Sequence, residues 1–218
     1  MKDPAHVVWD WNGTLLDDFG LTAEIAGRTL AALGVEGVTG EDIRTHFRRP
    51  FGAFYASLFG RPVSVDEFRY IRDRYQLEYE AQHLELRLQS DALAAMDLLA
   101  ERDATQSLLS MAPDPQLQAL VDHHHLRGRF QLVEGSPEHD SDGNKAVHLA
   151  RHLAALRVEP AAAFVIGDTV DDHEAAVASG AGSVLVTTGS TSRASLEATG
   201  APVVETLLDA AMIVIRGE

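Results

Sequence analysis

Short apolar runs alternate with amphipathic stretches along most of this 218-residue chain. The apolar runs have the length of buried strands, and the stretches between them repeat apolar positions every three or four residues, as helices do. The expected strands are Val7–Trp9, Gln106–Leu109, Phe130–Val133, Ala163–Ile166, Val184–Val186 and a weaker Val203–Val204. The expected helices are Ala92–Ala100, Gln116–Asp122, Lys145–Ala155, Glu174–Ser179, Ala194–Ala198 and Leu207–Ile215. This alternation predicts an α/β fold, a Rossmann-like parallel sheet with helices on both faces.

One interval interrupts the alternation, because it contains helical patterns and no convincing strand. Leu21–Leu33 has the pattern of a helix that Gly34 stops, Thr39 has that of the N-cap of a second helix, and Val65–Leu88 is long and charged. We expect this interval to form an inserted α-helical cap over the edge of the sheet. The alternative is that its helices cover one face of the sheet. The expected domains are an α/β core of residues 1–17 and 91–218 and a cap of residues 18–90.

Composition and charge narrow the classes of function. The chain has no cysteine, which excludes disulfides, thiolate metal sites and cysteine nucleophiles. Thirty-three acidic residues against 18 basic ones give a formal charge of −15, so nucleic acid and anionic membranes are disfavoured as partners. No apolar run approaches the roughly 20 residues of a bilayer span, and the N-terminus lacks the pattern of a signal peptide. We expect a cytoplasmic protein, monomeric or homodimeric.

A carboxylate directly follows the first predicted strand. Asp10 ends the apolar run and is followed by Trp11, Asn12 and Gly13, a turn-forming sequence. Open α/β sheets bind their ligands at the carboxyl ends of the strands, so Asp10 is a candidate nucleophile or metal ligand. The alternative interpretation is a turn with no chemical role.

Polar residues occupy the corresponding places elsewhere in the chain. Ser110 follows Gln106–Leu109, and Lys145, one of only two lysines, begins a predicted helix. Asp168 follows the fourth strand, with Asp171 and Asp172 close behind. Each of these residues could be a helix cap or a surface residue if it stood alone. Together, and in this order, they predict one site at the carboxyl edge of the sheet.

These positions resemble a known set of motifs. Asp10-x-x-Gly-Thr, Ser110, Lys145 and Gly167-Asp168-x-x-x-Asp172 are similar to the four motifs of the haloacid dehalogenase-like hydrolase superfamily. The helical insertion after the first motif resembles the cap of the phosphoglycolate phosphatase-like branch. The resemblance implies a Mg²⁺-dependent phosphohydrolase that acts on a small phosphorylated metabolite through an aspartyl-phosphate on Asp10. It does not identify the substrate, because the cap sets that choice.

The resemblance also implies a metal site. Asp10, the backbone carbonyl of Asn12 and Asp168 would supply oxygens to Mg²⁺, which prefers hard oxygen ligands. Asp172 fits the spacing of the family better than Asp171 as a fourth, supporting carboxylate.

A second set of residues would bind the phosphoryl group and the rest of the substrate. Ser110 would hydrogen-bond a phosphoryl oxygen, and Lys145 would neutralise charge on the phosphoryl group and on Asp10. The candidates for further substrate contacts are the backbone amides of Trp11 and Met111, the indole of Trp11 at the entrance, and Arg48 and Arg49 of the cap.

Position 12 departs from the pattern of the family. Its phosphatases carry a second Asp there, which protonates the leaving group and then activates water, whereas Asn12 cannot exchange a proton near neutral pH. Such a loss typically costs about 10²–10⁴ in rate. The sequence leaves open a slow phosphatase, a preference for good leaving groups such as acyl phosphates, and a non-catalytic phosphoryl-ligand binding protein. It also leaves open a substitute proton donor, for which the candidates are His46, His83 and His139. Asn12→Asp is expected to raise phosphatase activity.

Two other chemistries of the superfamily also lack the second Asp. Phosphonate hydrolysis uses a cap lysine, and the absence of lysine from residues 3–144 excludes it. A 2-haloacid dehalogenase would use Asp10 without a metal, but Asp168, Asp171 and Asp172 would then form a costly cluster of like charges. Dehalogenation is therefore the less favoured alternative.

Overall fold

The core of the protein is a single six-stranded parallel sheet. A computed structural model describes residues 6–137 and 143–217, and its strands lie in the order β3-β2-β1-β4-β5-β6. The strands are β1 (His6–Trp9), β2 (Thr105–Pro113), β3 (Val133–Ser136), β4 (Ala163–Gly167), β5 (Gly182–Val186) and β6 (Val203–Val204). The direction of winding changes between β1 and β4, and open α/β sheets bind ligands at this switch point. The predicted Rossmann-like fold is confirmed.

Helices cover both faces of the sheet, because the central strands are apolar on both sides. In β1, Val7 and Trp9 belong to one buried cluster with α5, α6 and α10, while Val8 belongs to a second with α7 and α8. Burying each such side chain contributes about 1.5–3 kcal/mol. The core helices are α5 (Ala92–Ala100), α6 (Asp114–His123), α7 (Lys145–Leu156), α8 (Val170–Ser179), α9 (Arg193–Glu197) and α10 (Leu207–Arg216). Two short 3₁₀ helices, η2 (Arg127–Arg129) and η3 (Pro160–Ala162), complete the core.

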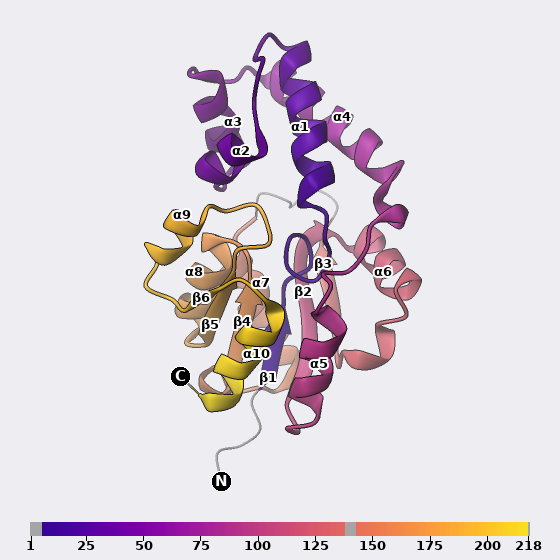
Figure 1. Ribbon diagram of the computed structural model, residues 1–218, viewed down its shortest axis with the longest axis vertical. Helices are drawn as coiled ribbons and strands as arrows, with labels where there is room; N and C mark the ends of the chain where they lie inside the picture. Colours follow the sequence, from indigo (N-terminus) through magenta and orange to yellow (C-terminus); the bar gives the residue numbers. More distant parts are fainter. Residues whose placement is uncertain (1–5, 138–142, 218) are drawn as a thin grey trace.

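The part of the chain between β1 and α5 is helical and lies beyond the carboxyl end of the sheet (Figure 1). Its helices are α1 (Phe19–Ala32), α2 (Gly40–His46), α3 (Phe51–Phe59), α4 (Val65–Glu80) and the 3₁₀ helix η1 (His83–Glu85). They form an inserted cap and do not cover a face of the sheet. The two connections to the core run side by side, because Leu16 and Leu88 form an antiparallel bridge. Residues 18–90 remain our proposed extent of the cap.

Some boundaries differ from those expected. Strand β2 continues through Ser110 to Pro113 instead of ending at Leu109, and β3 begins at Val133, where the predicted strand ended. The long pattern of Val65–Leu88 divides into α4 and η1. Helix α3 was not expected. The differences at β2 and β3 arise where these two neighbouring strands pair with a register shift between Leu109 and Pro113.

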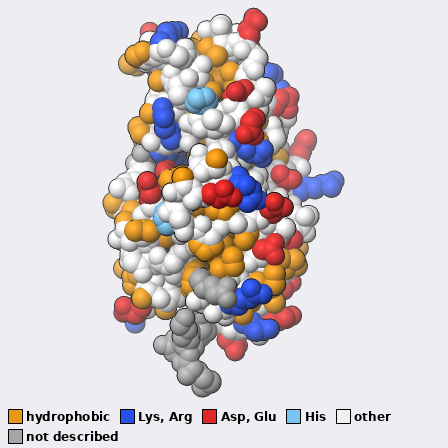
Figure 2. Space-filling view, turned by 60° about the vertical axis from the view of Figure 1, so that its left-hand side comes forward, with side chains coloured by type: hydrophobic (Ala, Val, Ile, Leu, Met, Phe, Trp, Pro, Cys, Tyr) orange, Lys and Arg blue, Asp and Glu red, His pale blue; other side chains and the backbone are white. Residues whose placement is uncertain are grey.

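The surface carries charges of both signs. On the face shown in Figure 2, acidic and basic side chains are interspersed, with apolar side chains between them. Within the described residues, every helix is too short or too polar to cross a membrane.

Candidate active site

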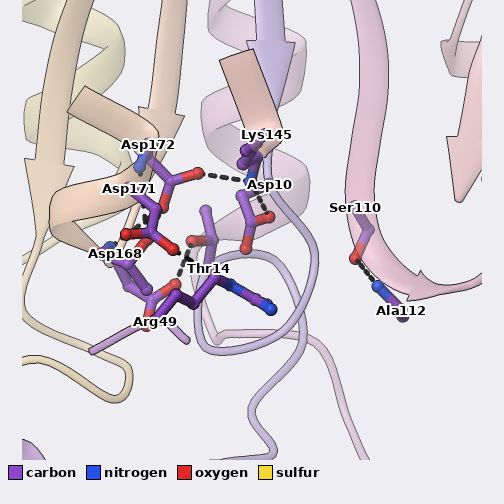
Figure 3. Close-up of polar contacts among 10 residues, drawn as sticks. Asp10, Thr14, Arg49, Ser110, Ala112, Lys145, Asp168, Asp171 and Asp172 are labelled. Carbon is purple, nitrogen blue, oxygen red and sulfur yellow. Dashed lines mark hydrogen bonds and ion pairs between the residues drawn. The ribbon is translucent and has the colours of Figure 1, made fainter. Parts of the chain in front are cut away.

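A buried ion-pair cluster lies at the carboxyl end of β1. Asp10 follows β1, and its backbone N–H donates to the carbonyl of Ile166 in β4 at 2.9 Å. The ammonium Nζ of Lys145, the first residue of α7, lies 2.5 Å from Oδ1 of Asp10. The same ammonium donates to Oδ1 of Asp172 at the start of α8 (Figure 3). One lysine therefore links carboxylates that come from two separate βα connections.

Asp168 is held between two loops. It follows β4, where its Oδ2 accepts a hydrogen bond from the backbone N–H of Ser190 at 2.7 Å and its Oδ1 accepts one from Oγ1 of Thr14 at 3.2 Å. Gly13 makes this approach possible, because it has a positive φ of +71° and a side chain there would lie 2.7 Å from Oδ2 of Asp168. Gly13 therefore allows the turn after β1 to pack closely against Asp168 after β4.

Asp172 is fixed by the start of its own helix. Its Oδ2 accepts hydrogen bonds from the backbone N–H of Thr169 at 3.0 Å and from Oγ1 of Thr169 at 2.6 Å. The N–H of Asp172 donates to Oγ1 of Thr169, which completes a capping box. This cap leaves Oδ1 of Asp172 directed to Lys145, and it explains why Asp172, and not Asp171, joins the cluster.

The cluster holds more negative than positive charge. Burial raises the pKa of Asp10 to about 7, since the neighbouring Lys145 only partly offsets it and Asp172 adds repulsion. Burial and the carboxylates of Asp10 and Asp172 also raise the pKa of Asp168 well above its usual value. Burial by itself lowers the pKa of Lys145, but Asp10 and Asp172 outweigh that effect and keep the pKa above its usual value.

The donor set fits a hard divalent cation. One oxygen from each of Asp10, Asp168 and Asp172 lies within 4.8 Å of the others, and all three residues are buried. Three carboxylates opposed by a single ammonium are costly to bury, and a bound cation would offset the excess charge. Oxygen ligands in this number suit Mg²⁺. Three of the four residues that the sequence assigns to the metal are thus brought together, and the part of the Asn12 carbonyl stays a prediction.

The predicted phosphoryl-binding residues on β2 lie to one side of this cluster. Ser110 is buried inside the strand, and its Oγ accepts a hydrogen bond from the backbone N–H of Ala112 at 3.0 Å (Figure 3). Within the described residues its side chain makes no hydrogen bond to Asp10 or Lys145. The neighbouring Met111 is 6% exposed. The roles of both residues stay predictions.

The two cap arginines behave differently. Nε of Arg49 lies 3.0 Å from Oδ2 of Asp171, so this guanidinium reaches from the cap to the first turn of α8. Burial raises the pKa of Asp171, while the adjacent Arg49 lowers it. Arg48 instead donates to the backbone carbonyl of Ala53 within the cap, at 3.2 Å. Only Arg49 is drawn beside the carboxylates in Figure 3.

The side chain of Trp11 does not line an entrance. It is fully buried in the core cluster that also contains Leu15, and its ring packs 6.0 Å from that of His124. That prediction is wrong, because the turn after β1 directs the indole into the apolar interior. The backbone amide of Trp11 remains a candidate donor.

Among the residues that the structure describes, the candidate proton donors His46 and His83 make no hydrogen bond to Asp10. Nδ1 of His83 pairs with the backbone carbonyl of Glu80 at 2.8 Å, and its ring stacks on that of Tyr79. His46 is the last residue of α2. His139 lies outside the described residues.

Two residues that the sequence analysis missed contact Asn12. Its amide Nδ2 donates to Oδ2 of Asp18 at 2.7 Å and to the hydroxyl of Tyr79 at 2.9 Å. Asp18 lies shortly after the first motif. The pair of acidic residues at positions 17 and 18 was the signal in the sequence that could have pointed to it. Tyr79 carries no such signal, since only the packing of the cap brings it to residue 12.

Comparison with known proteins assigns the family. A family model described as haloacid dehalogenase-like hydrolase matches residues 7–176, and a second, described as HAD-hydrolase-like, matches residues 145–210. The chain belongs to the haloacid dehalogenase-like hydrolases. The first match includes Asp10, Lys145 and Asp168, the residues that the site brings together. The superfamily resemblance seen in the sequence is confirmed.

Solved structures of low sequence identity share the whole architecture. A protein described as a predicted phosphatase from Clostridium acetobutylicum superposes with a TM-score of 0.81 at 18% identity, over 97% of this chain and 98% of that one. A haloacid dehalogenase-like family hydrolase from Streptococcus pneumoniae gives 0.80 at 20% identity, over 97% and 99%. A protein described as a predicted phosphoglycolate phosphatase from Haemophilus somnus gives 0.75 at 14% identity, over 96% and 97%.

The curated relatives of the chain are named as kinases, and not as phosphatases. The tyrosine-protein kinase PtkA of Mycobacterium tuberculosis is 26% identical over 188 residues, which are 85% of this chain and 62% of the relative. The corresponding protein of Mycobacterium bovis matches equally well. The chain thus spans about 62% of the length of these relatives.

Proposed function

We propose that this haloacid dehalogenase-like hydrolase is a Mg²⁺-dependent phosphohydrolase acting on a small phosphorylated metabolite, with Asp10 as the nucleophile. The observation that supports this most is the buried contact of Asp10 with Lys145, beside the carboxylates of Asp168 and Asp172. Neither a nucleic acid nor a membrane is part of the proposal, since the net charge of −15 disfavours both.

Asp10, the carbonyl of Asn12 and Asp168 would hold the cation, with Asp172 in support. Bound Mg²⁺ would offset the charge of the cluster and of the phosphoryl oxygens. An oxygen of Asp10 attacks phosphorus, the bond to the ester oxygen breaks, and an aspartyl-phosphate forms. Lys145 stabilises the charge that spreads over the phosphoryl oxygens. Water then attacks phosphorus, releases inorganic phosphate and regenerates the Asp10 carboxylate.

Asn12 sets a limit on the leaving group. A carboxamide cannot give a proton to a departing alkoxide, so the proton must come from solvent. Acyl phosphates and aryl phosphates lose a weakly basic group and need little such help. We therefore expect these compounds to be hydrolysed faster than phosphates of simple alcohols.

The proposed contact to the rest of the substrate is Arg49. Asp10 is only 7% exposed, so a substrate can reach it only when the cap moves away from the sheet edge. The ion pair of Arg49 with Asp171 joins the cap to the core. A second anionic group on the substrate would compete with Asp171 for the guanidinium.

A phosphate-ester screen with Mg²⁺ tests the proposal. We expect wild-type protein to hydrolyse acetyl phosphate and p-nitrophenyl phosphate, EDTA to suppress turnover and Asp10→Asn to abolish it. Asp17→Asn is the matched control, since Asp17 lies in the same loop but is exposed. Turnover that persists in Asp10→Asn would exclude the covalent route. Binding of vanadate without turnover of any ester would favour the phosphoryl-ligand binding protein, and release of halide from a 2-haloacid would favour the dehalogenase.

Asn12 and the curated relatives together favour a second candidate, phosphoryl transfer from ATP to a tyrosine. ADP is a good leaving group, and a phenol with a pKa of about 10 is deprotonated far more readily than water, so neither step depends on a carboxylate at position 12. The γ-phosphoryl would pass to Asp10 with loss of ADP, and then to the phenolic oxygen, whose proton goes to solvent. Incubation with labelled ATP and a tyrosine-containing peptide tests this: label in the peptide supports transfer, whereas inorganic phosphate alone supports hydrolysis.

A further inference from the structure

Three polar side chains from distant parts of the chain meet beside the nucleophile loop. The amide of Asn12 donates to Oδ2 of Asp18 and to the hydroxyl of Tyr79, at 2.7 and 2.9 Å. The hydroxyl of Tyr79 donates in turn to Oδ2 of Asp18, also at 2.9 Å. The backbone N–H of Gly13 donates to Oδ1 of Asp18 at 2.7 Å. Both oxygens of this carboxylate are therefore engaged, and the three side chains form a closed ring of hydrogen bonds.

The ring lies where the cap joins the core. Asp18 immediately precedes α1, and Tyr79 is the penultimate residue of α4, so one comes from the entry to the cap and the other from its last long helix. Each is only 3% exposed. At such a position each polar group needs a specific partner, because water is not available to replace one.

The carboxylate dictates the orientation of Asn12. Oδ1 and Oδ2 of Asp18 already accept hydrogen bonds from Gly13 and Tyr79, so the amide turns its Nδ2, and not its oxygen, toward Asp18. Both amide hydrogens are then used, and the side chain has only its oxygen to offer to a ligand. A carboxyl group at position 12 would instead set two acceptor oxygens against each other at about the 2.7 Å that now separates donor from acceptor.

We propose that Asn12 and Asp18 are an exchanged pair, in which the carboxylate that family phosphatases carry at position 12 stands at position 18 and the carboxamide at position 12 complements it. Asp18 and Tyr79 are positioning residues: they hold Asn12 so that its oxygen accepts a hydrogen bond from an incoming O–H without removing the proton. The proposal rests on the proposed reaction at Asp10. It also changes the expected outcome of Asn12→Asp, because that single substitution creates a repulsion which Asp18→Asn must relieve.

A double-mutant cycle tests the exchange. Wild type, Asn12→Asp, Asp18→Asn and the double variant are compared by thermal unfolding under the same buffer conditions. We expect each single substitution to lower the Tm by several degrees, with the larger loss for Asn12→Asp, which removes the amide donor and sets two acceptor groups against each other. The double variant regains most of the loss, since a carboxamide at position 18 can donate to a carboxylate at position 12 and still accept from the N–H of Gly13. Additive losses in the double variant would overturn the proposal.

Turnover supplies the readout that a purely structural pair would not change. With p-nitrophenyl phosphate and Mg²⁺, we expect kcat of the double variant to exceed that of Asn12→Asp by about tenfold or more, and its pH profile to gain an ionisation that wild type lacks. A stable double variant with the kcat and pH profile of wild type would overturn the positioning role. If none of the four proteins hydrolyses the ester, the proposed function fails, whereas the Tm cycle still decides whether the pair is exchanged.

Tyr79→Phe removes one hydroxyl from the ring and keeps the aromatic packing. We expect kcat to fall about three- to tenfold with little change in KM, because Asn12 loses one of its two fixed partners. Tyr75→Phe is the matched control: Tyr75 lies one turn earlier on α4, stacks on Tyr79, and places its hydroxyl 3.1 Å from Oγ1 of Thr22 instead. Equal effects of the two substitutions on kcat would show that Tyr79 acts only through the stability of the cap.

Discussion

Gly189 and Asp168 are in such close contact that the glycine has no room for a side chain. A methyl group at position 189 would lie 1.9 Å from Oδ2 of Asp168, well inside van der Waals contact. The next residue, Ser190, donates its backbone N–H to the same oxygen. The loop after β5 therefore determines where this carboxylate stands.

The first prediction follows from that contact. Gly189→Ala should displace the Asp168 carboxylate and weaken Mg²⁺ binding, so the Mg²⁺ concentration for half-maximal activity should rise about tenfold or more. Gly128→Ala is the control, since an added methyl group there meets no atom within 4 Å. Unchanged Mg²⁺ dependence in Gly189→Ala would mean that Asp168 is not a ligand.

The second prediction concerns Lys145. Lys145→Met removes the ammonium that contacts both Asp10 and Asp172, so kcat should fall by about 10²–10³. Lys145→Arg should recover little of this loss, because the larger planar guanidinium does not fit a buried site built around a point charge. Lys2→Met, at the other lysine of the chain, serves as the control. Activity within threefold of wild type in Lys145→Met would contradict the assigned role.

The third prediction is a pH dependence of stability. Asp10 has a pKa of about 7 in the folded protein against an ordinary value of 3.8, so between these values only the folded state keeps the proton. The free energy of unfolding of the metal-free protein should therefore decrease as the pH rises from about 4 to about 7. Since Mg²⁺ competes with that proton, saturating Mg²⁺ should raise the Tm more at pH 8 than at pH 5.

Calorimetry in EDTA and in Mg²⁺ at the two pH values checks this prediction. In Asp10→Asn the decrease with pH should become smaller, and so should the effect of Mg²⁺. An equal Mg²⁺ effect at both pH values in wild type would place the cation away from Asp10.

The fourth prediction separates the two cap arginines. Arg49→Ala should raise KM by about 10- to 100-fold for a substrate that carries a second anionic group, since a charged hydrogen bond contributes about 1.5–3 kcal/mol. Arg48→Ala should change KM little, because Arg48 bonds to the backbone within the cap. Steady-state kinetics on the best ester of the screen that carries a second anionic group decides between them, and equal KM values for the two variants would exclude Arg49 as a substrate contact.

The strands and helices of the core could largely be predicted, because their patterns are local. Ala92–Ala100 and Val203–Val204 have the predicted ends, since a periodic apolar face or a short apolar run is visible within a few residues. The end of β2 could not be predicted in the same way. Ser110 is polar, yet the neighbouring strand keeps the backbone extended as far as Pro113.

The site shows the same division. Asp10 and Asp168 could be named from their places after strands, since parallel strands bring their carboxyl ends to one edge. Lys145 was named as the start of a helix, and the choice of Asp172 over Asp171 came from the family resemblance. The contact of Asn12 with Tyr79 joins residues 67 positions apart through the packing of the cap, and no local pattern reports it. The indole of Trp11 was misplaced because a turn residue can point either outward or into the core.

The bridge between Leu16 and Leu88 brings together the two points at which the chain enters and leaves the cap. Because the chain leaves the sheet and returns to it at neighbouring points, a short linker could span the gap without altering the order of the strands. Recombination could replace this insertion with another and leave Asp10, Lys145 and Asp168 in register. A new insertion could therefore change the choice of metabolite while the nucleophile and the metal ligands stay in place, provided that it supplies a partner for Asn12 where Tyr79 now stands.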